Sequence, residues 1–186
     1  MNWRIVLSFA FLCAFVSPVL AQDKPAKSDA NAKTETLELA GGKVIVNIPG
    51  TWKTMTPRNQ MIANEYRFPI EGDKSARITF SVAGGSIDSN IDRWITQFDG
   101  AKKEDAKIEK KEISGIKVNL VELEGTFKDS MGPGSPVKKL ESHRLLGVIL
   151  EIKDGPQIFI KATGPKEIIA DMKEGFIKMV DGLKSK

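Results

Sequence analysis

The chain has 186 residues, with 28 Lys and Arg against 24 Asp and Glu, which gives a formal net charge of +4 at pH 7. This excess of positive charge is too small to indicate a nucleic-acid partner. With only one cysteine, Cys13, and one histidine, His143, the composition excludes a disulfide framework and metal sites built from several histidines or thiolates.

Residues 1–21 are predicted to be a cleavable signal peptide. Arg4 precedes an apolar run over 5–16, and small residues follow near Ala21. This run is shorter than the roughly 20 residues that a membrane-spanning helix needs. We therefore expect export to the periplasm or the medium, a mature chain without a transmembrane segment, and loss of Cys13 with the peptide.

Residues 22–36 are polar and rich in Ala, Lys and Asp, a composition typical of a disordered tether. Residues 37–186 then form a single predicted domain. Because this domain has no cysteine, its stability must come from burial of apolar side chains, for which its length is sufficient.

Short alternating runs of apolar and polar residues predict strands, and the turn residues between them predict hairpins. A spacing of two between apolar residues in 44–48, after the glycine turn at 41–42, predicts a first hairpin that starts at Leu37. Runs 64–68 and 76–83 predict a second hairpin.

Residues 86–98 interrupt the strand pattern and predict a helix. Either Ser86 or Asp88 could cap its first turn. Its apolar residues at helical spacing are Ile87, Ile91, Trp94, Ile95 and Phe98.

Two further hairpins are predicted, from 107–113 with 116–127 and from 142–153 with 157–163. Residues 145–152 are apolar on both faces, as expected for a central strand.

A second helix is predicted over 166–183, directly after Pro165. Its apolar stripe consists of Ile169, Met172, Phe176, Val180 and Leu183. Two helices and about eight hairpin-connected strands predict an α+β fold, in which helices cover the faces of an antiparallel sheet.

This order of elements resembles the PsbP family, named after an extrinsic photosystem II subunit. The segments that carry the resemblance are Pro49–Trp52, Arg93-Trp94, Gln97-Phe98 and Phe159–Pro165. The resemblance implies an α/β/α sandwich, shared with a Ran-binding nuclear import factor, and a binding or assembly role. It implies no catalytic residues, and nothing in the chain indicates a duty in photosynthesis.

Two segments are candidate contacts for an anion or a partner. Gly84, Gly85 and Ser86 precede a helix, so they either form a turn with a cap or offer amides to an anion. The second candidate is the loop 128–139, whose glycines and prolines are expected to make it project from the sheet, either as a mobile loop or as a partner contact. The candidate residues of this loop are Met131, Gly132, Pro133 and Gly134.

No catalytic constellation is evident. His143 lacks a nucleophile motif near it and is interpreted as a surface histidine, while Glu122 and Glu124 are interpreted as a solvated strand face. Trp94 is expected in the core, whereas Trp52 could be in the core or line a cavity. Four arginines could form an anion patch, although the sequence cannot place them on one surface; they are Arg58, Arg67, Arg77 and Arg93.

The leading hypothesis is an exported, non-enzymatic binding or assembly protein of the cell envelope, without a cofactor or a metal, whose partner is a protein or envelope component. A small-molecule or lipid carrier is the first alternative and requires a large apolar cavity near Trp52. An enzyme of unfamiliar type is the second alternative and requires a polar pocket around His143 or clustered carboxylates.

Overall fold

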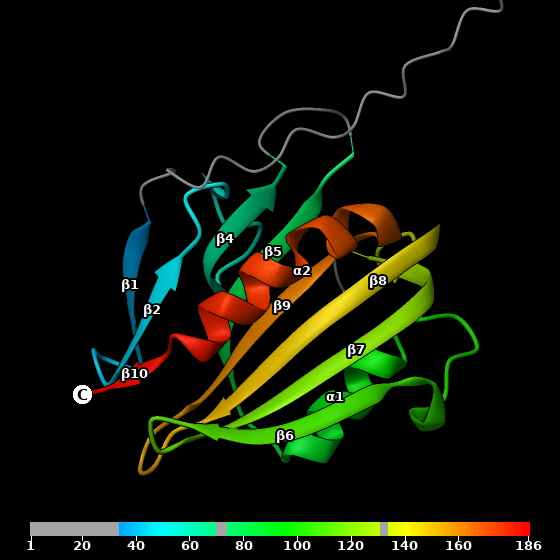
Figure 1. Cartoon of the computed structure of the whole chain (residues 1–186). Coiled ribbons are helices and arrows are strands. Elements are labelled where there is room, and N and C mark those ends of the chain that lie inside the picture. The colour runs from blue at the N-terminus through cyan, green and yellow to red at the C-terminus, as the bar shows by residue number, and fades with distance from the viewer. Residues whose placement is uncertain (1–33, 70–73, 131–133) are drawn as a thin grey trace, which may run out of the picture.

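The computed structural model describes residues 34–69, 74–130 and 134–186 (Figure 1). Within these ranges, the two α-helices are α1 (Ile87–Ile95) and α2 (Lys166–Asp181), and a short 3-10 helix covers Lys103–Asp105. The strands are β1 (Glu35–Leu39), β2 (Val44–Ile48), β3 (Lys53–Met55), β4 (Ile62–Phe68), β5 (Ala76–Ala83), β6 (Lys107–Ile113), β7 (Ile116–Asp129), β8 (Lys138–Glu151), β9 (Gln157–Pro165) and β10 (Lys184–Ser185).

The strands form two antiparallel sheets. The larger has seven strands in the order β3-β4-β5-β9-β8-β7-β6, and the smaller has the order β1-β2-β10. All four predicted hairpins and the α+β class are confirmed, and β8 lies inside the larger sheet as expected. The structure also has a smaller second sheet, in which β2 pairs with β1 and with the C-terminal strand β10. Strand β10 was not predicted, because its two residues are too short to show alternation.

The folded domain begins earlier in the sequence than predicted. Strand β1 begins at Glu35, two residues before the predicted domain start, and its Thr36 pairs with Asn47 of β2. The predicted signal peptide and the tether up to residue 33 lie outside the described residues.

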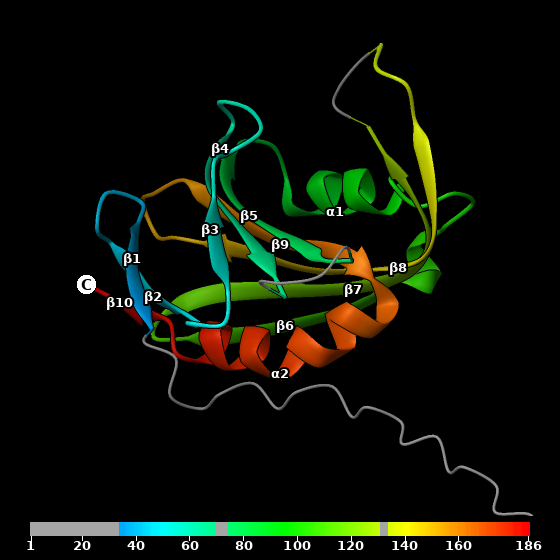
Figure 2. The same cartoon turned by 90° about the horizontal axis from the view of Figure 1, so that it is seen from above.

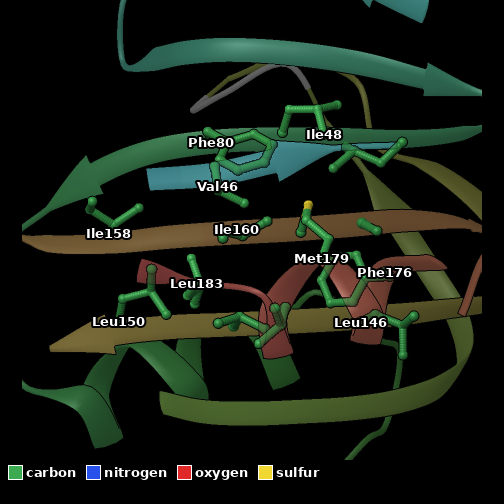
Figure 3. Close-up of a cluster of buried hydrophobic side chains, with 14 of the residues drawn as sticks. Val46, Ile48, Phe80, Leu146, Leu150, Ile158, Ile160, Phe176, Met179 and Leu183 are labelled. Carbon is green, nitrogen blue, oxygen red and sulfur yellow. The ribbon is translucent and has the colours of Figure 1, made fainter. Parts of the chain in front are cut away.

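The molecule is layered, with α1 and α2 on opposite faces of the large sheet (Figure 2). This arrangement is the α/β/α sandwich that the resemblance implied. The small sheet lies on the same side as α2, where Val46 and Ile48 share one buried cluster with Phe80 and Phe176 (Figure 3). One face of the large sheet is therefore covered by a helix and a second sheet together.

The other face is covered by α1 alone. Ser86 caps this helix by accepting a hydrogen bond from the Ser89 amide at 3.1 Å, which confirms Ser86 as a cap. Trp94 is 4% exposed and packs edge-on against Phe159 of β9. Its ring occupies the space above Gly147 of β8, where a Cβ would lie 2.3 Å from a ring carbon.

Helix α1 covers only part of the sheet face on which it lies. Its cluster includes side chains of β7, β8 and β9, such as Val121, Leu145 and Phe159. On β4 and β5, the positions of the same face carry polar side chains, including Arg77 and Thr79. That end of the sheet therefore stays open beside the helix.

The long hairpin of β7 and β8 bends toward the α1 side (Figure 2). A bulge lies at the bend, because Glu141 and Ser142 of β8 together oppose Thr126 of β7, and Ser142 has a positive φ of 52°. The predicted irregular loop 128–139 was too long, since β7 continues to Asp129 and pairs with Lys138 of β8. At both ends of this segment, the antiparallel pairing of β7 with β8 continues into residues that were predicted to be irregular.

The contact between Gly147 and Trp94 predicts a steric penalty in the α1 core. We expect Gly147→Ala to lower the free energy of unfolding by about 1–3 kcal/mol, because the added methyl group displaces the Trp94 ring. The measurement is urea unfolding followed by tryptophan fluorescence.

Gly84→Ala is the matched control, because a Cβ at Gly84 meets no atom within 4 Å and φ there is not positive. Its free energy of unfolding should stay within about 0.5 kcal/mol of the wild type. Equal stabilities of the two variants would contradict the proposed packing.

Candidate functional site

A pocket of about 350 Å³ lies at the open end of the large sheet, next to the last turn of α1. Residues of β5 and β9 line it, together with the bent end of β7 and β8 and the loop that contains Arg58. The lining residues are Arg58, Ser75, Arg77, Gln97, Phe127, Lys128, Asp129, Ser130, Leu140, His143, Lys161, Thr163 and Gly164. We call this hollow the basic pocket.

Lys161 extends from the central strand β9 into the basic pocket. It shares the α1 face with Thr79, its register partner on β5. Its ammonium Nζ donates a hydrogen bond to Gln97 Oε1 at 3.0 Å. Burial, and next the charges of Arg77 and Arg93, lower the pKa of Lys161 to about 8, and Asp129 only partly opposes this.

Glu65 holds two arginines at the edge of the pocket. Glu65 is 5% exposed, and its carboxylate accepts two hydrogen bonds from Arg77, at 2.7 and 2.9 Å, and one from the Arg58 amide at 3.1 Å. Burial alone raises the pKa of Glu65, but the bonds from Arg77 and Arg58 outweigh it and leave the pKa below its usual value. This arrangement fixes the Arg77 guanidinium and the loop around Arg58.

His143 lies at the rim, directly after the bulge of β8. Its ring stacks on Phe127 with 6.3 Å between centroids, and Nδ1 lies 2.8 Å from the carbonyl oxygen of Glu141. The structure therefore places His143 in a polar pocket, which is the condition that the sequence analysis set for an enzyme.

The charges of the basic pocket are unequal. Among the described residues that line it are the cations Arg58, Arg77, Lys128 and Lys161 and one carboxylate, that of Asp129. When Glu65 is counted as well, cations remain in excess among the described residues of this site. An excess of cations in a partly sheltered hollow attracts anionic groups more strongly than the same charges on an open surface, since the nearby protein screens them less than water.

Two of the four arginines that the sequence singled out meet in this site. Arg58 and Arg77 share Glu65. Arg67 lies opposite Arg77 on β4, and Arg93 donates to Asn90 on α1 while its charge acts on Lys161. Sequence reasoning did not find Lys161, although one signal was present: it is the only charged residue in the otherwise apolar or neutral strand β9.

The predicted glycine site is explained by local structure. The Ser86 hydroxyl caps α1, and the Gly84 and Gly85 carbonyls accept hydrogen bonds from Asn90 and Gln157. An anion contact at these three residues stays a prediction. Of the predicted loop contacts, Met131, Gly132 and Pro133 lie outside the described residues, and Gly134 is exposed and does not line the basic pocket.

The cavity that a carrier would need near Trp52 is filled. Trp52 is buried, with its ring 6.2 Å from Tyr66 and 6.3 Å from Phe176 between centroids. The predicted core position of Trp94 is confirmed. Glu124 is exposed, as expected for a solvated face, and pairs with Lys166 and Arg144. Glu122 is partly buried and pairs with Lys173 of α2.

The described part of the chain offers neither a metal-binding cluster nor a helix suited to crossing a membrane. There, no group of three or more His, Cys, Asp or Glu side chains could hold a metal ion. No helix of residues 34–69, 74–130 and 134–186 is long and apolar enough to cross a membrane.

The lowered pKa of Lys161 predicts that this lysine costs stability. The unfolded chain holds this proton up to the ordinary pKa of 10.5, and the folded chain loses it near 8. We expect Lys161→Met to be more stable than the wild type at pH 7, by about 1–3 kcal/mol. The advantage should shrink as the pH rises from 8 to 10.5, where the folded wild type has released the proton that the unfolded chain still holds.

Urea unfolding of both proteins at pH 7 and pH 10 measures this difference. Lys153→Met, at an exposed residue between β8 and β9, is the matched control and should show no such trend. A Lys161→Met variant that is less stable than the wild type at pH 7 would contradict this assignment.

Comparison with known proteins found solved structures with a similar fold. No protein family description matches the chain, and no curated protein matches it by sequence. Among solved structures, cyanobacterial PsbP (CyanoP) from Synechocystis is similar over 88% of this chain and 98% of its own, at 11% identity and a TM-score of 0.53.

The Ran-binding protein Mog1p from Saccharomyces cerevisiae matches over 83% of this chain and 96% of its own, at 10% identity and a TM-score of 0.45. Identities this low compare folds and transfer no activity. Taken with the two helices on opposite faces of an antiparallel sheet, the likeness to CyanoP shows that this chain has the PsbP-like fold.

Proposed function

We propose that this chain is an exported binding protein of the cell envelope, which holds an acidic segment of a partner protein against its α1 face and catalyses no reaction. The observation that carries the proposal is the basic pocket, whose described lining residues include four cations and one carboxylate. A complementary partner would bring carboxylates to this excess of cations.

The shape of the α1 face supports binding of a segment. The β3–β4 hairpin and the bent β7–β8 hairpin both rise on the α1 side of the sheet (Figure 2). The basic pocket draws its lining from strands between them and from the loop that contains Arg58. An extended segment lying there would meet Arg58, Lys128 and Lys161 together.

An enzymatic role is the second candidate, because His143 lines a polar pocket. We favour binding because the Lys, Arg and Asp side chains among the described lining residues are mainly cations. The buried carboxylate beside it, Glu65, accepts hydrogen bonds from Arg77 on both of its oxygens, so it is poorly suited to act as a base.

Site-specific photo-cross-linking in the source cells tests the proposed partner. A photoreactive amino acid in place of Ser75, at the basic pocket, should give a protein-sized adduct. The same residue in place of Ala170, which is exposed on α2 at the opposite face, is the control and should give none.

The adduct supports the proposal only if it depends on the pocket. Adding Lys161→Met to the Ser75 variant should reduce the adduct several-fold, and mass spectrometry of the linked peptide should identify an acidic segment. Equal adducts at both positions, or an adduct that Lys161→Met leaves unchanged, would overturn the proposal.

Export has its own test. We expect the protein recovered from the envelope fraction to begin at Gln22, because signal peptidase should cut after Ala21. Intact-mass measurement gives the N-terminus directly. Recovery of the chain only from the cytoplasm, with residues 1–21 still attached, would refute export.

A further inference from the structure

We infer that the basic pocket is a binding site for one oxyanion, a carboxylate or a phosphate group, and that Lys161 takes up a proton when this group binds. The inference rests on the proposed function, in which a partner presents the group. It adds the chemistry of the ligand, the residue that senses it and a dependence on pH.

The first argument is the missing counter-ion of Lys161. In the described part of the chain, its Nζ makes one hydrogen bond, to the neutral amide of Gln97. An ammonium group has three donors, so two of them have no partner among the described residues, and lysines are rarely buried without a charged partner. Arg77 shows the usual arrangement, since Glu65 neutralises it.

The second argument is the charge that surrounds Lys161 from each neighbouring element. Arg77 on β5 and Arg93 on α1 both repel its proton, while Asp129 on β7 attracts it. Lys128 and His143 also line the pocket. Burial and this repulsion lower the pKa of Lys161 to about 8, so a bound anion would reverse part of that shift.

The third argument is the size of the pocket. A volume of about 350 Å³ is near the lower end of ligand sites, which suits a small charged group better than a large molecule. Ser75 and Thr163 add hydroxyl groups to the lining. Ammonium, guanidinium and hydroxyl donors together are the groups that bind oxyanions.

The coupling between anion binding and proton uptake by Lys161 determines how the affinity depends on pH. If the free protein has a Lys161 pKa near 8 and the bound protein a higher one, binding takes up a proton between these two values. Affinity is therefore highest below pH 8 and falls as the pH rises through the bound-state pKa. By reciprocity, the fall in affinity equals the ratio of the two acid dissociation constants.

The experiment is an NMR titration of the mature protein with 13C-labelled lysine, using succinate and inorganic phosphate as separate probes. We expect saturable shifts of the Lys161 signal and a Lys161 pKa raised by about one unit in the bound state, which corresponds to roughly tenfold weaker binding at pH 10 than at pH 7. Succinate serves for the pH series, because its carboxylates stay ionised over this range.

Three variants locate the site. Lys161→Met should weaken binding roughly tenfold or more and remove the pH dependence. Arg58→Gln, which keeps the backbone contact of Arg58 with Glu65, should weaken binding while the pH dependence remains. Lys153→Met, at the opposite end of the same strands, should bind like the wild type.

The inference is overturned if neither probe shifts Lys161 saturably, or if Lys161→Met binds as well as the wild type. Its failure is distinguishable from failure of the proposed function. Binding of either probe without a Ser75 adduct would keep the oxyanion site and reject the protein partner. An adduct without binding of either probe would keep the partner and reject the oxyanion site. The tighter of the two probes identifies the group as carboxylate or phosphate.

Discussion

Unequal coverage of the two faces of the seven-stranded sheet is the constraint on which the rest of this structure depends. An antiparallel sheet with apolar residues on both faces needs a cover on each side. On one side, the 16-residue helix α2 and the small sheet share this task. On the other, α1 has only nine residues and packs mainly on β7, β8 and β9, and the positions of that face on β4 and β5 carry mostly polar side chains.

The polar end of the α1 face follows from this gap. Glu65 and Arg77 stand on neighbouring strands and pair there, which satisfies a buried carboxylate and fixes a guanidinium at the same time. Lys161 is different, because it stands on a central strand, under partial cover, with a neutral amide as its hydrogen-bond partner. A charge in this position is a local conflict with the packing of the sheet, and such conflicts are expected where a protein binds something.

The bend of the β7–β8 hairpin completes the pocket. Its bulge lets the hairpin turn toward α1, and the Phe98–Phe127 contact and the bond between the Lys128 amide and the Gln97 carbonyl tie it to the end of the helix. Gln97, which holds Lys161, therefore sits in a segment that the hairpin itself stabilises. The site is built from segments distant in sequence, so no short motif marks it, and its character lies in electrostatics instead of a catalytic arrangement.

The sequence by itself determined the two helices and the four hairpins, and which of their side chains are apolar enough to be buried. Alternation with a period of two specified the four hairpins, helical spacing specified α1 and α2, and the run 145–152 specified a central strand, because each pattern reflects contacts within a few residues. Only the tertiary structure decided that β2 pairs with β10, that β7 and β8 continue into the predicted loop, and that Arg58, Arg77 and Lys161 meet while Gly134 stays apart. The reason is physical: these outcomes depend on strand register and on which face each cover occupies, and both are set by contacts between residues far apart in the chain.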